Sequence, residues 1–203
     1  MFLETFEISH GDFETLIKRT KPGNAGRIMI PWFTGERTPD VPGATPFYFG
    51  FKLNDFHKNT LARAILEGHV LNLYNGFRRM PVTPVEIRLT GGLSRSEAWR
   101  QCIADVFEAE TVPAAGEGAA LGAALHAAWV WNKEAGRAIS LEELVKPFVI
   151  PDETRRSKPV PQNVEIYRKQ KRLFGALVSR ILGAGGKDPF LLRDAVLRFG
   201  ITN

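Results

Sequence analysis

The chain has 203 residues, of which 44% are hydrophobic and 24% are charged. These proportions are ordinary for a globular protein, so they exclude a disordered chain and predict one sizeable core with an appendage. The longest largely apolar stretch, residues 119–131, is shorter than the ~20 residues of a membrane-spanning helix. The first residues lack the pattern of a secretory signal, so we expect a cytoplasmic protein that does not associate with a membrane.

The net charge of +5 is concentrated near the end of the chain, where residues 151–203 hold 11 basic and 5 acidic side chains. The densest basic run, Arg168–Arg172, lies in an amphipathic pattern, which favours a solvated helix face over a nucleic-acid patch. The single cysteine, Cys102, excludes an internal disulfide and a cysteine-rich metal site. The sequence therefore predicts neither a nucleic-acid partner nor metal-ligating residues.

The first part of the chain predicts two strands followed by a long helix. A short helix at residues 12–19 leads through a turn into an apolar strand at 27–31, and an aromatic strand follows at 47–51. The long helix is predicted over residues 57–79 and packs on the core through one stripe. The stripe consists of Ala62, Leu66, Val70, Leu73 and Phe77.

A strand, a glycine turn and a helix follow in direct succession. Residues 85–89 alternate like a strand and run into Thr90-Gly91-Gly92. Ser94 and Glu97 have the spacing of a capping box, which predicts that the next helix begins there. A short strand at 110–113 then precedes a helix of small residues from 116 to about 133, whose small side chains permit close backbone approach.

The remainder of the chain is predicted to be helical. Ser140 and Glu143 form a second capping box, and residues 151–161 read as a polar connector containing prolines. Two further helices are separated by glycines, with Asp188 capping the last one. The alternation of strands and helices along the whole chain predicts an α/β architecture with parallel strand pairing.

The turn at Gly91 and Gly92 carries the strongest chemical signal. A glycine pair between a strand and a helix lets a ligand lie against the main chain, and free amides at the helix start favour anionic groups. Such turns also occur as plain connections, so both interpretations stay open here. Residues 183–187 mimic a phosphate-binding loop, but Ile181 and Asp188 stand where that loop requires a glycine and a hydroxyl residue.

Three segments, in this order along the chain, bear on the choice between these two interpretations. Residues 30–39 read Ile-Pro-Trp-Phe-Thr-Gly-Glu-Arg-Thr-Pro, Gly50 is followed by Leu61–Gly68, and residues 87–96 read Ile-Arg-Leu-Thr-Gly-Gly-Leu-Ser-Arg-Ser. The chain thereby resembles the FGGY carbohydrate kinase family. The first segment is similar to that of its xylulose kinases, the second to a family signature, and the third to the adenosine motif of actin-like ATPases.

The resemblance implies an α/β fold that forms part of the C-terminal actin-like ATPase (ribonuclease H-like) domain of a sugar kinase, with extra C-terminal helices. Residues 1–150 would form the nucleotide-binding domain, incomplete at its N-terminus. Residues 151–203 would form a connector and helices that pack on it. The leading strands of that domain would precede Met1, so an exposed sheet edge is expected, and formation of a homodimer would cover it.

The implied activity is transfer of the ATP γ-phosphoryl group to a sugar hydroxyl, with Mg²⁺ bridging the phosphates and D-xylulose as the expected sugar. Gly91 and Gly92 would meet ATP or ADP through their backbone, and Ser94 and Ser96 through their hydroxyls. The family's general base and sugar-binding residues lie in its N-terminal half, so we expect this chain alone to be inactive. The alternative is a truncated, non-catalytic binding or interaction module.

Overall fold

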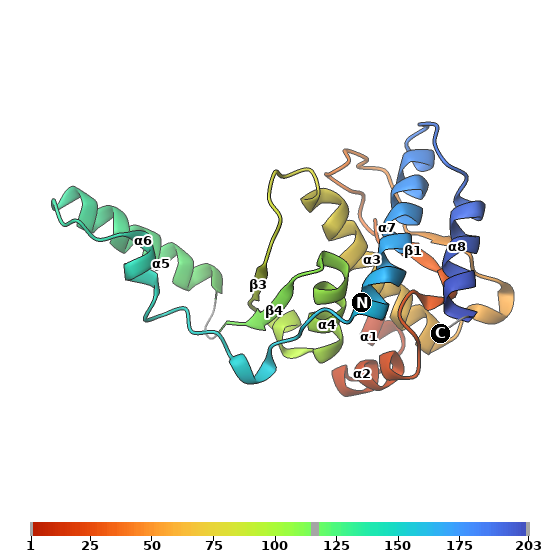
Figure 1. Cartoon of the computed structure of the whole chain (residues 1–203), viewed down its shortest axis with the longest axis horizontal. Coiled ribbons are helices and arrows are strands. Elements are labelled where there is room, and N and C mark those ends of the chain that lie inside the picture. Colours follow the sequence, from red (N-terminus) through yellow and green to blue (C-terminus); the bar gives the residue numbers. More distant parts are fainter. Residues whose placement is uncertain (1, 115–117, 202–203) are drawn as a thin grey trace.

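The computed structural model, which describes residues 2–114 and 118–201, has a helical body around two short sheets and a helical arm that projects from it (Figure 1). The body is built from the first eight helices and strands and the last two helices, and the arm from the two helices between them. In chain order the elements are α1 (Phe2–Thr5), α2 (His10–Lys18), β1 (Ile28–Ile30), β2 (Phe47–Phe49), α3 (Lys58–Phe77), β3 (Glu86–Leu89), α4 (Glu97–Phe107), β4 (Glu110–Pro113), α5 (Gly118–Glu134), α6 (Leu141–Val145), α7 (Pro161–Ile181) and α8 (Pro189–Ile201).

The two sheets differ in strand direction. β3 and β4 pair in parallel, with Leu89 opposite Pro113, and α4 is the crossover between them. β1 and β2 pair antiparallel, with Ile30 opposite Phe47. Parallel pairing is therefore confirmed for β3 and β4 and wrong for β1 and β2. Residues 31–46, which join β1 to β2, contain no helix, and a chain without a crossover helix returns antiparallel.

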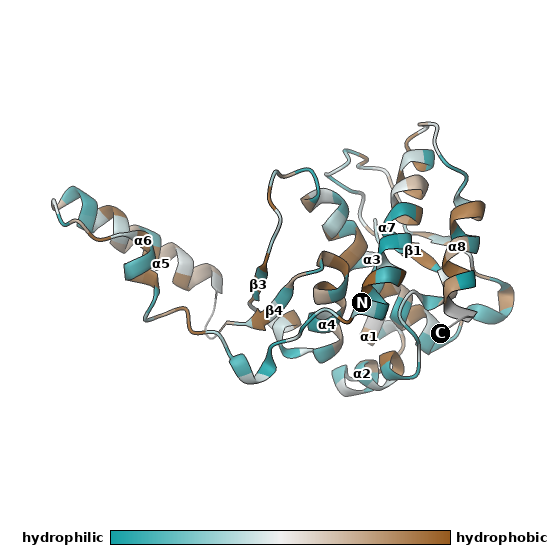
Figure 2. Ribbon diagram, in the orientation of Figure 1, coloured by the Kyte–Doolittle hydropathy of each residue, from teal (hydrophilic) through white to brown (hydrophobic). Residues whose placement is uncertain are grey.

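The long helix α3 is enclosed by β1, α2, α4 and α7. Ala62, Leu66 and Val70 are buried, as the predicted stripe requires, but Leu73 is 58% exposed, so the prediction is wrong there. Because neighbours surround α3, it buries more than one face, and a single stripe describes it poorly. In Figure 2 the apolar residues of α3 and β1 gather in the middle of the body. A Cβ at Gly68 would lie 2.3 Å from the Met29 carbonyl oxygen, so α3 approaches β1 closely.

Helix α4 begins two residues later than the sequence predicts. Its N-cap is Ser96, whose hydroxyl accepts a hydrogen bond from the Trp99 amide at 3.2 Å. Ser94, the predicted cap, lies in a 3-10 turn (Gly92–Arg95) and donates to the Gly91 carbonyl at 2.7 Å. The capping-box spacing was misleading because this extra turn separates the glycine pair from the helix. The second predicted capping box is confirmed at the start of α6.

The arm consists of α5 and α6, which pack on each other away from the body (Figure 1). Residues 116 and 117, where the helix of small residues was predicted to begin, lie outside the described residues. At Gly118 the expected close approach is confirmed, since a Cβ would come within 3 Å of the Thr90 side chain. Further along α5, Leu125 is buried and most other residues are not. Neither α5 nor another helix of the described part is long and apolar enough to cross a membrane.

Candidate functional site

The glycine pair lies at the carboxyl end of β3, the edge of a parallel sheet where ligands of α/β proteins bind. Gly91 has a φ of +75°, a conformation that side chains disfavour, and both Gly91 and Gly92 are exposed. A Cβ atom added to either glycine would meet no heavy atom of the described residues within 4 Å, apart from those of its neighbours along the chain. The backbone here is open to a ligand that lies flat against it.

The two predicted serines face the protein. Ser94 is buried, and its hydroxyl closes the turn by donating to the Gly91 carbonyl. The Ser96 hydroxyl accepts from the Trp99 amide and donates to the carboxylate of Glu14 on α2. The structure therefore brings Gly91 and Gly92 to an open surface, while Ser94 and Ser96 hold the turn and the helix behind it.

The start of α4 already holds a carboxylate. Besides its contact with Ser96, Glu14 accepts a hydrogen bond from the Ala98 amide at 3.2 Å, and Lys18 on the same helix pairs with Glu97 at 3.3 Å. The expectation of free amides at this helix start is thus wrong at Ala98 and Trp99. Sequence reasoning missed Glu14 because 82 residues separate it from Ser96, and no local pattern indicates the contact.

Two arginines donate hydrogen bonds to the backbone carbonyls that follow the glycine pair. Arg100 on α4 is buried and donates to the Ser94 carbonyl at 2.8 Å. Arg155, from the connector, donates to the same carbonyl at 3.3 Å and to that of Arg95 at 2.9 Å. Burial, together with the charge of Arg155, lowers the pKa of Arg100 from its ordinary value. The turn therefore rests on a positively charged support that sequence reasoning did not identify.

A side chain of the connector also bridges β3 and β4. Arg156 donates to Glu86 on β3 at 2.8 Å and to Glu110 on β4 at 3.0 Å. Hydrogen bonds to Arg88 and then Arg156 lower the pKa of Glu86, so its carboxylate stays ionised. Arg156 thereby bridges the first residues of the two strands, at the opposite end of β3 from the glycine turn.

Glu36 and Cys102 have structural roles. Glu36, in the loop between β1 and β2, accepts hydrogen bonds from Asn72 and from the amides of Arg37 and Thr38. Partial burial opposes ionisation of Glu36, but these bonds outweigh it, and its pKa lies below the ordinary value. Cys102 is 3% exposed, and burial raises the pKa of its thiol, as expected for a core residue. Across residues 2–114 and 118–201, no three acidic, histidine or cysteine side chains cluster to hold a metal ion.

Comparison with known proteins places the chain in a family. Residues 9–131 match the FGGY family of carbohydrate kinases, C-terminal domain. The chain is 34% identical to a gluconokinase of Bacillus licheniformis, over 78% of this chain and 31% of that protein. It is also 34% identical to a xylulose kinase of Haemophilus influenzae, over 77% of this chain and 32% of that one. The chain thus spans about a third of the length of these curated relatives.

Solved structures agree with the sequence relatives. The crystal structure of ligand-bound xylulose kinase from Lactobacillus acidophilus matches with a TM-score of 0.74 and 25% identity, over 88% of this chain and 36% of that one. Gluconate kinase from the same organism matches with a TM-score of 0.73 and 25% identity, over 87% and 35%. The C-terminal domains of these kinases have the actin-like ATPase fold, which confirms the predicted α/β class. The chain belongs to the FGGY family of carbohydrate kinases, and its residues 9–131 match the family's C-terminal domain.

Proposed function

We propose that this chain is the ATP-binding portion of a carbohydrate kinase that transfers the γ-phosphoryl group of ATP to a sugar hydroxyl. The observation that carries the proposal is the open backbone of Gly91 and Gly92 at the carboxyl end of β3. Family membership supports the use of ATP, and the turn is the feature of this chain best suited to a flat ligand.

In this proposal the backbone of Gly91 and Gly92 contacts the adenosine part of ATP or ADP. Ser94 and Ser96 act through their hydroxyls by shaping the turn and the start of α4. Bound ATP supplies the phosphoryl group, and Mg²⁺ neutralises charge on its phosphates. We assign no Mg²⁺ ligand to this chain, because its described residues contain no cluster of candidate ligands.

Phosphoryl transfer depends on holding the two reactants in line and neutralising charge, which requires groups on both sides of the substrates. The chain spans about a third of its curated relatives, so we propose that a second lobe completes the cleft and that this chain alone is inactive. We propose D-xylulose as the sugar and the cytoplasm, where ATP is available, as the compartment. Relatives named gluconokinase make gluconate the substrate to test against it.

The test of nucleotide binding is a calorimetric titration of the chain with ADP, and with ATP plus Mg²⁺. Gly92→Asp should abolish binding, because its side chain fills the open space beside the turn and adds a negative charge. Gly43→Asp is the matched control, since Gly43 is also an exposed loop glycine with open space around it. Equal binding by wild type and Gly92→Asp would place the nucleotide elsewhere.

A second assay addresses turnover by following ADP formation with D-xylulose and with gluconate. The chain alone should give no turnover, and addition of a kinase N-terminal lobe should restore it with D-xylulose. Restoration with gluconate alone would reject the proposed sugar and leave the kinase assignment intact. Turnover by the isolated chain would reject the claim that a second lobe is required.

A further inference from the structure

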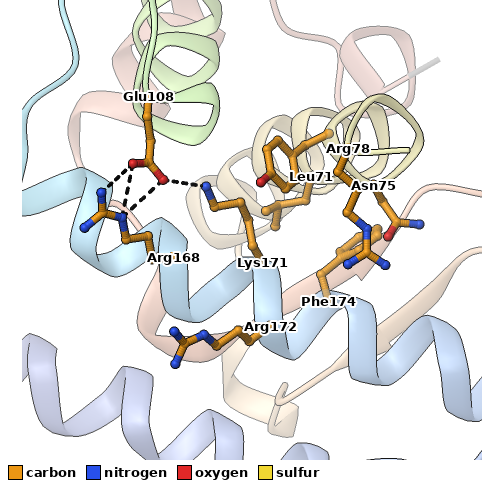
Figure 3. A pocket seen from close by; sticks show the side chains of 9 residues that line it. Leu71, Asn75, Arg78, Glu108, Arg168, Lys171, Arg172 and Phe174 are labelled. Carbon is orange, nitrogen blue, oxygen red and sulfur yellow. Dashed lines mark hydrogen bonds and ion pairs between the residues drawn. The ribbon is translucent and has the colours of Figure 1, made fainter. Parts of the chain in front are cut away.

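A second concave site lies at the other end of α4. A pocket of about 310 Å³ opens between α3, the residue that follows α4, and α7 (Figure 3). The glycine turn precedes α4, whereas Glu108 in the pocket follows it, and a helix of 11 residues is about 16 Å long. The pocket is therefore separate from the proposed nucleotide site. It is lined by Leu71, Tyr74, Asn75, Arg78, Glu108, Arg168, Lys171, Arg172 and Phe174.

The pocket has an excess of positive charge. Its nine lining residues include four cationic side chains and one carboxylate, that of Glu108. Glu108 is shared by Arg168, at 2.5 Å, and Lys171, at 2.9 Å, and Figure 3 shows it between them. Hydrogen bonding to Arg168 and then to Lys171 lowers the pKa of Glu108 to about 2, so the carboxylate stays charged. Even with Glu165, which also pairs with Arg168 at 2.5 Å, two carboxylates balance only two of the four cations.

Two of the arginines have no acidic partner in the described part of the chain. Arg78 comes from the C-terminal end of α3, and Arg172 comes from α7 on the facing side. The salt bridges of residues 2–114 and 118–201 include neither. Both residues are exposed and line the pocket, and a planar guanidinium can bind a phosphate or carboxylate through two parallel hydrogen bonds.

The amide of Asn75 adds to the donor set. Asn75 is only 4% exposed and lines the pocket, and its side chain has no hydrogen-bond partner among the described residues. In Figure 3 its amide lies next to Arg78 and Phe174. The amide atoms are not among the fully buried unpaired atoms of the described residues, so they meet solvent at the pocket and are open to a ligand there. Tyr74, with the Lys171 ammonium 4.4 Å from its ring centre, is the aromatic residue that a ligand in the pocket could reach, because Phe174 is only 1% exposed.

We propose that this pocket binds a small phosphorylated metabolite, whose phosphate draws the long side chains of Arg78 and Arg172 toward each other and whose carbon skeleton packs against Tyr74. A phosphate monoester carries close to two negative charges, which match the two unpaired guanidinium groups. The volume lies at the lower end of the range for small-molecule sites. A concave pocket with one accessible aromatic side chain fits such a molecule better than an extended nucleic-acid backbone. The inference does not depend on the proposed function.

The test is a calorimetric titration of the whole chain, at constant ionic strength, with ribose 5-phosphate, inorganic phosphate and citrate. Ribose 5-phosphate should bind saturably at one site, several-fold more tightly than inorganic phosphate or citrate. The double variant Arg78→Gln/Arg172→Gln should lose about tenfold or more of this affinity. The matched control is Arg79→Gln/Arg180→Gln, because Arg79 directly follows Arg78, Arg180 lies on α7, and both are exposed and outside the pocket. It should bind like wild type.

Several outcomes would overturn the proposal. Equal loss in both double variants would show attraction by net charge alone, and tighter binding of citrate would indicate a carboxylate site. Equal affinity for inorganic phosphate would remove the role of the carbon skeleton. Binding of a single-stranded oligonucleotide that displaces ribose 5-phosphate, or absence of saturable binding, would also reject it. Gly92→Asp should leave ribose 5-phosphate binding intact even if the nucleotide proposal fails, so the two claims can be separated.

Discussion

Ser96, the N-cap of α4, donates its hydroxyl hydrogen to the carboxylate of Glu14, so one side-chain pair joins α2 to the helix that follows the glycine turn. The other Glu14 oxygen accepts from the Ala98 amide. Negative charge at a helix N-terminus is favourable, and an N-cap satisfies an amide that would otherwise lack a partner. Glu14 therefore stabilises α4 from a distant part of the sequence.

This pair predicts a coupled loss of stability. Glu14→Ala and Ser96→Ala should each lower the free energy of unfolding by about 1–2 kcal/mol. The double variant should lose less than the sum by about 0.5–1 kcal/mol, because each single change already breaks their mutual bond. Urea denaturation of the four proteins measures the coupling. Thr15→Ala, an exposed change on the same helix, should cost little, and strictly additive losses would contradict the contact.

The close approach of α3 to β1 predicts opposite effects at two glycines of one helix. Gly68→Ala should lower the free energy of unfolding by about 2 kcal/mol or more, because the new methyl group would meet the Met29 carbonyl and push the elements apart. Gly76→Ala has open space around it and should raise stability by up to about 1 kcal/mol. Thermal unfolding of both variants measures the two effects. An unchanged stability of Gly68→Ala would contradict the close packing of α3 on β1.

Glu67 predicts an unusual dependence of stability on pH. It is 2% exposed, and one of its carboxylate oxygens accepts from the Gly23 amide at 2.8 Å and from the Tyr167 hydroxyl at 2.9 Å. Burial raises the pKa of Glu67 from 4.5 to about 7. The folded state therefore binds more protons than the unfolded state between these values, so the contribution of Glu67 to stability falls as pH rises through this window.

The expected loss between pH 4.5 and 7 is about 2–3 kcal/mol from this group. Glu67→Gln keeps the shape and removes the titration, so the variant should gain stability relative to wild type as pH rises. Denaturant unfolding at pH 5 and pH 8 compares the two proteins. Glu142→Gln, an exposed change on α6, is the control. A constant difference between Glu67→Gln and wild type would reject the raised pKa.

The arginine support predicts that the connector contributes to nucleotide binding. If the proposed function holds, Arg155→Gln should weaken ADP binding by about three- to tenfold, because the Arg95 carbonyl loses its donor, the Ser94 carbonyl keeps only that of Arg100, and the turn loosens. Lys158→Gln, which removes an exposed ion pair from the same connector, is the control. Calorimetry with ADP measures both, and equal affinities would remove Arg155 from the site.

The sequence predicted features whose causes are local. The apolar spacing within α3 and the Ser140–Glu143 capping box each depend on residues a few positions apart, and the structure confirms both helices. The position of the glycine pair after a strand was predictable for the same reason. Parallel pairing was predictable for β3 and β4, because a helix-length segment separates those strands.

The remaining features depend on contacts between distant residues. Ser94 and Glu97 satisfy the capping-box spacing, but Ser96 caps the helix with help from Glu14. Arg155 reaches the turn from 60 residues away, and the buried state of Arg63, Glu67 and Asn75 follows from neighbours that surround α3. No local pattern distinguishes these side chains from exposed ones, so the support of the site could be found only in three dimensions.

The arm leaves and re-enters the body at adjacent points, because Ala114 pairs with Pro151 and the Asp152 amide donates to the Pro113 carbonyl at 2.8 Å. The ends of the segment between them are thus fixed by the body itself. Each doubling of a flexible loop's length costs only about 0.6 kcal/mol of closure entropy. The length of the segment between these two fixed points could therefore vary at small cost to the rest of the fold.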